Sequence, residues 1–300
     1  KKSVSFVIPC RNEQETLGRV LTKINNLCED DFRDRQTEVI VCDNGSTDRS
    51  VEIAREHGTK VVHCEREGYG AALLFGIEEV GCEVVVFADA DDTYDFLETP
   101  KLVEKLEEGF DLVIGSRMQG EIHKGAMPFL HRYLGTPVLN FFLNLLYAKE
   151  GTKISDCNSG FRCFLRSSFL SWGVKSEGME FASEMLVKAL KSNARISHVP
   201  VSLYPDYAGR APHLERWRDG MRHLLQIFLD SPEFFFFAGY GLFIISWLVI
   251  LLGLFYGPVQ IAFATVLGLH SMMFGLLGSL FGIIIWAVGL FLAVRIKTSI

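Results

Sequence analysis

The sequence predicts an α/β protein with a mostly parallel sheet flanked by helices, followed by interfacial amphipathic helices and a transmembrane helical hairpin. Two observations lead to this prediction. In the first 115 residues or so, short apolar, β-branched segments alternate with segments of helical spacing, a pattern typical of right-handed βαβ units. From Phe234 to Val294 the chain has no Asp, Glu, Lys or Arg, and this stretch is long enough to cross a bilayer twice.

Composition separates the chain into three predicted parts and excludes some functions. We expect a globular domain at 1–210, an amphipathic juxtamembrane helix at 211–232 and a membrane region at 233–300, with spans near 234–256 and 271–294. A net charge of −6 argues against nucleic acid as a partner, because binding a phosphate backbone requires a basic surface. The seven cysteines form no CxxC pair, so neither a zinc site nor a thioredoxin-like motif is indicated.

Five apolar segments of the globular part are predicted to be parallel strands. A helix is expected from Glu13 to Cys28, with Asn12 as its N-cap and Glu15 completing a capping box. In parallel sheets, ligands bind beyond the carboxyl ends of the strands, so the strand-end segments 9–13, 43–48, 89–95 and 116–117 should converge on one cleft. The predicted strands are Val4–Pro9, Glu38–Cys42, Lys60–His63, Val84–Phe87 and Asp111–Gly115.

An acidic segment follows the fourth predicted strand, from Asp89 to Asp95. Asp89 and Asp91 are two residues apart and point the same way if the strand continues through them. Two close carboxylates repel each other, and a hard divalent cation relieves that repulsion, so the pair predicts a site for Mg²⁺ or Mn²⁺. The alternative is an acidic loop that caps a helix beginning near Glu98.

A glycine-rich segment, Gly68-Tyr69-Gly70, precedes another predicted helix. It is not a dinucleotide fingerprint, because the third glycine is missing and the segment follows the third strand rather than the first. Backbone amides at this helix N-terminus remain available to a phosphate.

Six motifs, in order, resemble an inverting family 2 glycosyltransferase of GT-A fold, of the dolichol-phosphate-mannose or polyprenyl-phosphate-glucose synthase type. The resemblance covers roughly residues 3 to 215. The motifs are Ile8-Pro9-Cys10-Arg11-Asn12-Glu13, Asp43-Asn44-Gly45-Ser46-Thr47-Asp48, Gly68-Tyr69-Gly70-Ala71-Ala72, Asp89-Ala90-Asp91, Gly115-Ser116-Arg117 and Asp156-Cys157-Asn158-Ser159-Gly160-Phe161-Arg162.

The resemblance implies a site for a nucleotide sugar and a metal ion. Asp89 and Asp91 would carry the metal and the sugar diphosphate. Thr93 stands where the family often has Gln, and Asn44 where a second Asp is common, so the third metal ligand is left open and Asp43 is the main carboxylate for the nucleotide. The residues implied to bind the nucleotide sugar are Pro9, Arg11, Glu13, Asp43, Gly68, Gly70, Asp89, Ala90 and Asp91.

The implied acceptor, a lipid monophosphate, is mostly ionised at neutral pH because its second pKa is about 6. It attacks the anomeric carbon without a protein base. Asp156 is expected to position the acceptor or an arginine, or to cap the turn at Asn158-Ser159-Gly160. With Asp89, Asp91 and Arg117 it completes the predicted catalytic set. The predicted acceptor and phosphate ligands are Arg117, His131, Arg132, Ser159, Arg162 and Arg210.

Two further segments indicate contact with a membrane. Met127 to Tyr147 is a long apolar helix that either lies on the membrane and admits a lipid or covers the sheet. His213 to Leu229 has apolar residues at three- and four-residue spacing with basic residues between them, which indicates an interfacial anchor. Because basic residues precede the first span and follow the second, we expect an integral membrane protein with a cytoplasmic catalytic domain and both termini inside. The spans also offer a surface for a homo-oligomer.

Together these features predict transfer of one hexose from GDP-mannose or UDP-glucose to a polyprenyl or dolichyl phosphate at the cytoplasmic face. The sequence does not choose between the two donors. One alternative is a processive polysaccharide synthase, although Glu215-Arg216-Trp217 lacks the glutamine of its QxxRW signature. The other is a non-catalytic, membrane-tethered nucleotide-binding scaffold.

Overall fold

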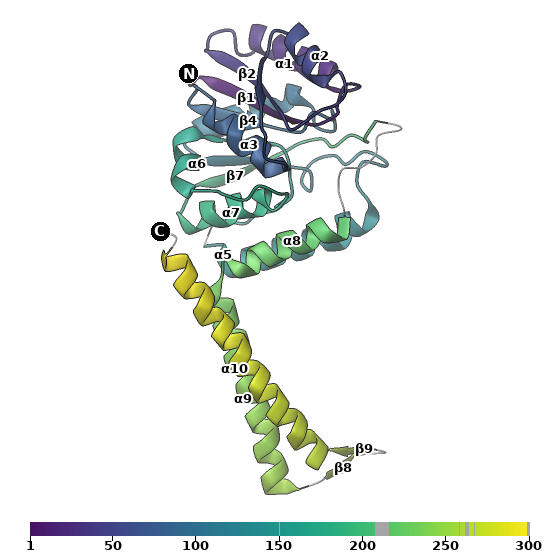
Figure 1. The fold of residues 1–300 in the computed structure, drawn as a ribbon, viewed down its shortest axis with the longest axis vertical. Helices are drawn as coiled ribbons and strands as arrows, with labels where there is room; N and C mark the ends of the chain where they lie inside the picture. Colours follow the sequence, from purple (N-terminus) through teal and green to yellow (C-terminus); the bar gives the residue numbers. More distant parts are fainter. Residues whose placement is uncertain (150, 208–215, 258, 262–263, 267, 299–300) are drawn as a thin grey trace. The chain divides into compact units, whose positions relative to one another are not determined.

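The computed structural model describes residues 1–149, 151–207, 216–257, 259–261, 264–266 and 268–298 (Figure 1). The chain divides into two compact units, residues 1–226 and 227–300, and each is described by itself.

The first unit is built on a seven-stranded sheet in the order β3-β2-β1-β4-β6-β5-β7. All strand pairs are parallel except those of β6, which runs antiparallel to both neighbours. The predicted α/β class with a mostly parallel sheet is confirmed. The strands are β1 Val4–Cys10, β2 Thr37–Asp43, β3 Lys60–His63, β4 Val84–Phe87, β5 Leu112–Ser116, β6 Arg162–Leu165 and β7 Ile196–Pro200.

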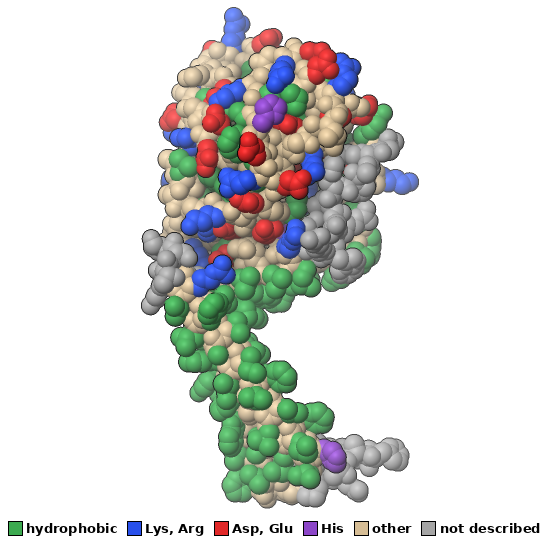
Figure 2. Space-filling model, viewed as in Figure 1, with side chains coloured by type: hydrophobic (Ala, Val, Ile, Leu, Met, Phe, Trp, Pro, Cys, Tyr) green, Lys and Arg blue, Asp and Glu red, His purple; other side chains and the backbone are tan. Residues whose placement is uncertain are grey.

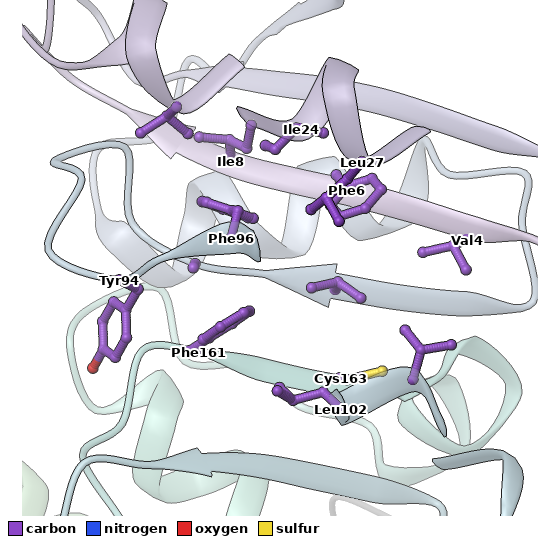
Figure 3. Packing of buried hydrophobic residues seen from close by; sticks show 14 of the residues in the cluster. Val4, Phe6, Ile8, Ile24, Leu27, Tyr94, Phe96, Leu102, Phe161 and Cys163 are labelled. Atoms are coloured by element: carbon purple, nitrogen blue, oxygen red, sulfur yellow. The ribbon is translucent and has the colours of Figure 1, made fainter. Parts of the chain in front are cut away.

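Helices pack on both faces of this sheet (Figure 1). One buried layer joins β1, β4 and β6 to α1 and α4, with Phe6, Phe96 and Phe161 near its centre (Figure 3). The helices of this unit are α1 Leu17–Glu29, α2 Ser50–Glu56, α3 Tyr69–Glu78, η1 Phe96–Glu98, α4 Thr99–Glu107, η2 His131–Gly135, α5 Thr136–Tyr147, α6 Arg166–Trp172 and α7 Phe181–Lys191. Helix α8 (Arg216–Leu229) begins in this unit and ends three residues beyond its boundary.

The predicted start of the first helix is wrong. Helix α1 begins at Leu17 with Thr16 as its N-cap residue. Asn12 instead has a positive φ of 57°, and its Oδ1 accepts a hydrogen bond from Thr47 N at 2.7 Å. Asparagine tolerates this left-handed backbone well, so Asn12 joins two loops rather than capping a helix.

The second unit is a pair of long apolar helices, α9 (Pro232–Tyr256) and α10 (Leu269–Thr298), joined by a short antiparallel hairpin of β8 (Val259–Ile261) and β9 (Ala264–Val266). Segments of 25 and 27 residues in these helices are long and apolar enough to cross a membrane. Only 17% and 22% of their most apolar windows are buried, so most hydrophobic side chains face outward (Figure 2). A buried core helix of a soluble protein would show the opposite pattern.

Small residues let α9 and α10 approach closely. Gly239, Ser246 and Gly253 are buried on α9 at intervals of seven, as are Gly275 and Gly282 on α10. A Cβ added to Gly239 would lie 2.6 Å from the carbonyl oxygen of Gly282. Backbone contact of this kind is how helices pack in lipid, where apolar burial between helices gives little driving force.

Candidate functional site

The loops after β1 and β2 are locked together by backbone and side-chain hydrogen bonds. Asn12 N donates to Ser46 Oγ at 3.1 Å, and Glu13 N donates to Ser50 Oγ at 2.8 Å. The Glu13 side chain is buried, whereas Arg11 is exposed and pairs with Glu67 at 3.4 Å. The two strand-end segments expected to meet therefore do meet.

Asp43, the last residue of β2, is buried with 5% of its surface exposed. Its Oδ1 accepts a hydrogen bond from Ser46 N at 3.0 Å, and its Oδ2 lies 3.1 Å from His63 Nδ1. Burial works to raise the pKa of Asp43, but the hydrogen bonds from Ser46 and His63 outweigh it and lower the pKa below its usual value. The group is therefore a carboxylate, an acceptor fixed at the strand end.

Asn44 donates hydrogen bonds that an aspartate, the residue common at this position in the resembled family, could not donate. Its Nδ2 donates to the carbonyl oxygens of Arg66 at 2.7 Å and Cys64 at 3.3 Å, while its Oδ1 accepts from Gly68 N at 2.9 Å. An ionised carboxylate cannot donate. The amide thus ties the end of β2 to the loop that leads into α3.

Gly68 and Gly70 pack against the backbone of residues 176–178. A Cβ on Gly68 would lie 2.1 Å from the Glu177 carbonyl oxygen, and one on Gly70 would lie 2.3 Å from that of Ser176. Ala71 N donates to the same Glu177 oxygen at 2.9 Å. This close approach accounts for both glycines, and their contact with a nucleotide sugar stays a prediction.

The carboxylates of the acidic segment from Asp89 to Asp95 differ in their partners. Strand β4 ends at Phe87, so strand alternation does not orient Asp89 and Asp91. The Oδ1 of Asp91 instead accepts hydrogen bonds from Thr93 N at 3.0 Å and Thr93 Oγ1 at 2.7 Å. The threonine that replaces the family's glutamine therefore fixes the orientation of Asp91.

Asp92 and Asp95 face the lysine of α1 instead. Lys23 Nζ lies 2.8 Å from Asp92 Oδ1 and 3.3 Å from Asp95 Oδ1, and Arg19 lies 3.7 Å from Asp92 Oδ2. Asp95 also accepts a hydrogen bond from Leu97 N at the start of η1. The capping role considered for the whole segment thus applies to Asp95.

Asp89 is enclosed by Tyr69 and Gly160. Burial, followed by the charge of Asp89 and the hydrogen bond that the Tyr69 hydroxyl donates to it, raises the pKa of that phenol well above its usual value. A Cβ on Gly160 would lie 2.8 Å from Asp89 Oδ2. Gly160 is held in turn by Tyr94, whose hydroxyl accepts a hydrogen bond from Gly160 N at 2.9 Å.

The pair Asp89 and Asp91 fits a divalent cation that arrives with phosphate. The part of the chain that the structure describes contains no cluster of three or more His, Cys, Asp or Glu side chains able to hold a metal ion. Mg²⁺ commonly binds one or two carboxylates and takes its remaining ligands from substrate phosphates and water. Two half-buried carboxylates at a strand end match that donor set.

The contact between Gly160 and Asp89 leads to a prediction. Gly160→Ala should displace the Asp89 carboxylate and lower kcat about tenfold to a hundredfold, because small misplacements of reacting groups are costly. The melting temperature should fall by only a few degrees, since one side-chain terminus has to move. Parallel kinetic and thermal-unfolding measurements check this, and an alanine variant with normal kcat would contradict it.

Arg117 and Asp156 form a buried, two-pronged ion pair. Arg117 Nε donates to Asp156 Oδ2 at 2.9 Å, Nη2 donates to Oδ1 at 2.8 Å, and the backbone N of Arg117 donates to Oδ2 at 2.9 Å. The Asp156 side chain has no exposed surface, and that of Arg117 is 13% exposed. Asp156 therefore positions an arginine, one of its predicted roles.

The structure does not support phosphate binding by Arg162 and Ser159. Arg162 has no exposed surface and donates to the carbonyl oxygens of Ser159, Ala182 and Cys157 at 3.0, 2.8 and 2.8 Å. Ser159 is equally buried, and its hydroxyl donates to the carbonyl oxygen of Gly115 at 2.5 Å. Backbone carbonyl oxygens occupy the hydrogen-bond donors of both side chains. The prediction that Arg162 and Ser159 bind phosphate is therefore corrected to a structural role for each.

Two further predicted cations come from the segment between β5 and α5. His131 and Arg132 belong to the π-helical turn η2, and the guanidinium of Arg132 lies 5.5 Å from the Tyr133 ring centroid. Arg210 lies outside the described residues. Three further side chains at the site, His63, Tyr69 and Tyr94, had no role predicted from the sequence. Their one signal was position, since His63 ends a predicted strand and both tyrosines lie within the segments that follow strands.

Comparison with known proteins agrees with the resemblance seen in the sequence motifs. The family model "Glycosyl transferase family 2" matches residues 5–172. The chain is 38% identical over 271 residues to the low-salt glycan biosynthesis hexosyltransferase Agl6 of Haloferax volcanii, covering 89% of this chain and 64% of that protein. It is 31% identical over 240 residues to the glycosyltransferase AglJ of the same organism (78% of this chain, 75% of AglJ). It is 32% identical over 210 residues to that organism's dolichyl-phosphate hexose transferase (69% and 84%).

A solved structure shares the fold. Glucosyl-3-phosphoglycerate synthase from Mycobacterium tuberculosis, in complex with Mn²⁺, UDP and phosphoglyceric acid, superposes with a TM-score of 0.61 at 23% identity, covering 76% of this chain and 78% of that one. At this identity the likeness shows the fold alone.

Proposed function

Because the chain belongs to glycosyl transferase family 2, we propose that it transfers one hexose, with inversion, from a nucleotide sugar to a polyprenyl or dolichyl phosphate. The observation that carries this proposal is that residues 156–160 connect two charged groups of opposite sign. Gly160 lies against Asp89, and Asp156 holds Arg117. A site of this kind meets a metal-bound diphosphate on one side and a phosphate anion on the other.

The donor would lie along the strand ends. Asp43, Pro9 and Glu13 would contact the nucleoside, with Arg11 and the backbone at Gly68 and Gly70 nearby. Asp89 and Asp91 would hold Mg²⁺ or Mn²⁺, which supplies positive charge to the diphosphate as it leaves. The donor is GDP-mannose or UDP-glucose in this proposal.

The acceptor phosphate needs no general base. An oxygen of the ionised lipid phosphate forms a bond to the anomeric carbon while the bond from that carbon to the diphosphate oxygen breaks. The nucleoside diphosphate leaves with the electron pair. Arg117, held rigidly by Asp156, would present its guanidinium to phosphate and offset the negative charge in the transition state.

We further propose that the lipid reaches the site across α5. The inner face of α5 is buried through Leu139, Leu143 and Tyr147, while its outer face and the preceding residues carry exposed large apolar side chains. This outer face would rest on the bilayer that α9 and α10 span, with residues 1–210 forming a cytoplasmic catalytic domain, 211–232 a juxtamembrane helix and both termini inside. The exposed apolar side chains are Val138, Phe141 and Leu145 on α5 and Phe129, Leu130, Tyr133 and Leu134 just before it, and together they are called the outer face of α5.

A charge placed on this outer face should weaken use of the lipid acceptor. Phe141→Glu should raise the KM for a long-chain polyprenyl phosphate about tenfold and leave the KM for the nucleotide sugar unchanged, because a carboxylate is costly at a bilayer surface. Leu170→Glu, at a 49% exposed leucine on α6, is the matched control and should change neither value. Equal effects of the two substitutions would argue against a membrane-facing α5.

The proposed activity is tested with the full-length chain in detergent or vesicles. Labelled GDP-mannose or UDP-glucose, with Mn²⁺ and a polyprenyl phosphate, should give a labelled product that partitions into organic solvent. A polymeric product would indicate a processive synthase instead. Protection of the protein by GDP or UDP without turnover would indicate a binding scaffold.

A further inference from the structure

Residues 154–157, which carry Asp156, run between α5 and the sheet. Two asparagines of α5, Asn140 and Asn144, are one helical turn apart and therefore project from the same side of the helix. The mechanism proposed above uses neither of them. Both side chains form hydrogen bonds with the backbone of this segment.

Each asparagine uses both ends of its amide on the segment. Asn144 Oδ1 accepts from Ile154 N at 2.8 Å, and its Nδ2 donates to Ile154 O at 2.8 Å. Asn140 Nδ2 donates to Ser155 O at 2.7 Å, and its Oδ1 accepts from Cys157 N at 2.9 Å. The two side chains thus replace a neighbouring strand and fix the backbone on both sides of Asp156.

The sheet holds the same segment from its other side. Ser155 Oγ lies 3.0 Å from Ser116 Oγ, next to Arg117 in the chain. Ser155 N donates to His198 Nε2 at 3.3 Å. Burial lowers the pKa of His198 to about 4, so its imidazole is neutral at neutral pH and can accept this bond. Asp156 is therefore clamped between a strand and a helix.

Helix α5 therefore carries two features. Asn140 and Asn144 hold the segment around Asp156, and the exposed apolar outer face is the surface assigned to the bilayer. We propose that Asn140 and Asn144 are positioning residues that hold Asp156, and through it Arg117, in a fixed place relative to α5. The position of α5 on the bilayer surface then determines where the guanidinium of Arg117 contacts the acceptor phosphate. This inference rests on the proposed function.

The test measures steady-state kinetics of the full-length Asn140→Ala and Asn144→Ala proteins with polyprenyl phosphate. Each variant should lose about tenfold in kcat, because the geometry of a charge-assisted contact is relaxed. The KM for the nucleotide sugar should stay within about twofold, since Asp43, Asp89 and Asp91 are fixed by other segments. Asn25→Ala is the matched control: this asparagine of α1 donates to the His57 carbonyl oxygen at 3.3 Å, and its loss should leave kcat unchanged.

A purely structural role is distinguished by combining these substitutions with Arg117→Gln. If the asparagines act through the guanidinium, either alanine substitution should lower kcat by less than about twofold in that background. A full tenfold loss there, or normal kcat of the single variants, would overturn the inference. Should an alanine variant fail to fold, Asn140→Asp gives the same test, because it keeps an acceptor for Cys157 N and loses the donor to Ser155 O.

The two proposals fail in different ways. A wild-type protein that transfers no hexose to any polyprenyl phosphate would count against the proposed function and the inference together. An active wild type whose Asn140 and Asn144 variants retain its kcat would overturn the inference alone.

Discussion

Asp91→Ala is expected to lower hexose transfer about a thousandfold and to leave the sheet intact. Asp91 follows β4 outside the sheet, and its Oδ1 is oriented by two hydrogen bonds from Thr93. Its carboxylate is one of two proposed ligands for the metal ion that stabilises the departing diphosphate. Removing a comparable electrostatic contact to a transition state costs two to three orders of magnitude in other enzymes, and loss of a metal ligand should cost at least as much.

The adjacent Asp92 provides the matched control. It faces away to Lys23 and Arg19, and its φ of 61° suits asparagine. Asp92→Asn should therefore keep the rate within about threefold and change stability by up to about 1 kcal/mol, the usual range for such an ion pair.

Rates are to be measured over a range of Mn²⁺ concentrations with thermal unfolding in parallel. The metal role of Asp91 would be wrong if Asp91→Ala kept a near-normal rate, or if both substitutions had the same effect.

Strands β1 to β5 could be predicted from the sequence because they are short runs rich in β-branched and other apolar residues, whereas β7, which pairs parallel with β5, was not predicted. The segments Val4–Pro9 and Val84–Phe87 correspond to β1 and β4 almost residue for residue. Strand β6 was missed because it begins with arginine, the last residue of a motif that had been assigned to substrate. Its antiparallel insertion between β4 and β5 depends on long-range pairing that no local pattern reveals.

The same limit explains the errors in the site. Residue type and spacing placed Asp43, Asp89, Asp91 and Arg117 at or just after strand ends, where the structure also has them. Residue type and spacing could not show that Arg162 lies in the sheet, where its side chain donates hydrogen bonds to carbonyl oxygens. Burial decides whether an arginine binds a substrate or the protein backbone, and burial is a property of the completed fold.

Asp156→Asn is expected to damage both stability and activity, because it breaks a buried ion pair from one side. Arg117 would keep its charge with no carboxylate to hold it. Arg162, whose pKa burial lowers and the charge of Asp156 helps to raise, would lose the same stabilising charge. Breaking such a pair costs about 3 kcal/mol or more, which corresponds to a fall in melting temperature of about 8 °C for a domain of this size. The kcat should fall about a hundredfold as Arg117 loses its orientation.

The double variant Arg117→Gln/Asp156→Asn separates the two effects. Removing both charges leaves no unpaired ion at position 117, and replacing a buried pair by neutral groups is often close to neutral in stability. The double variant should therefore recover at least half of the lost melting temperature, while its kcat should stay at or below that of Asp156→Asn. Thermal unfolding and kinetics on the three proteins check this. If activity returned together with stability, Asp156 would be a structural residue only, and Arg117 would not contact phosphate.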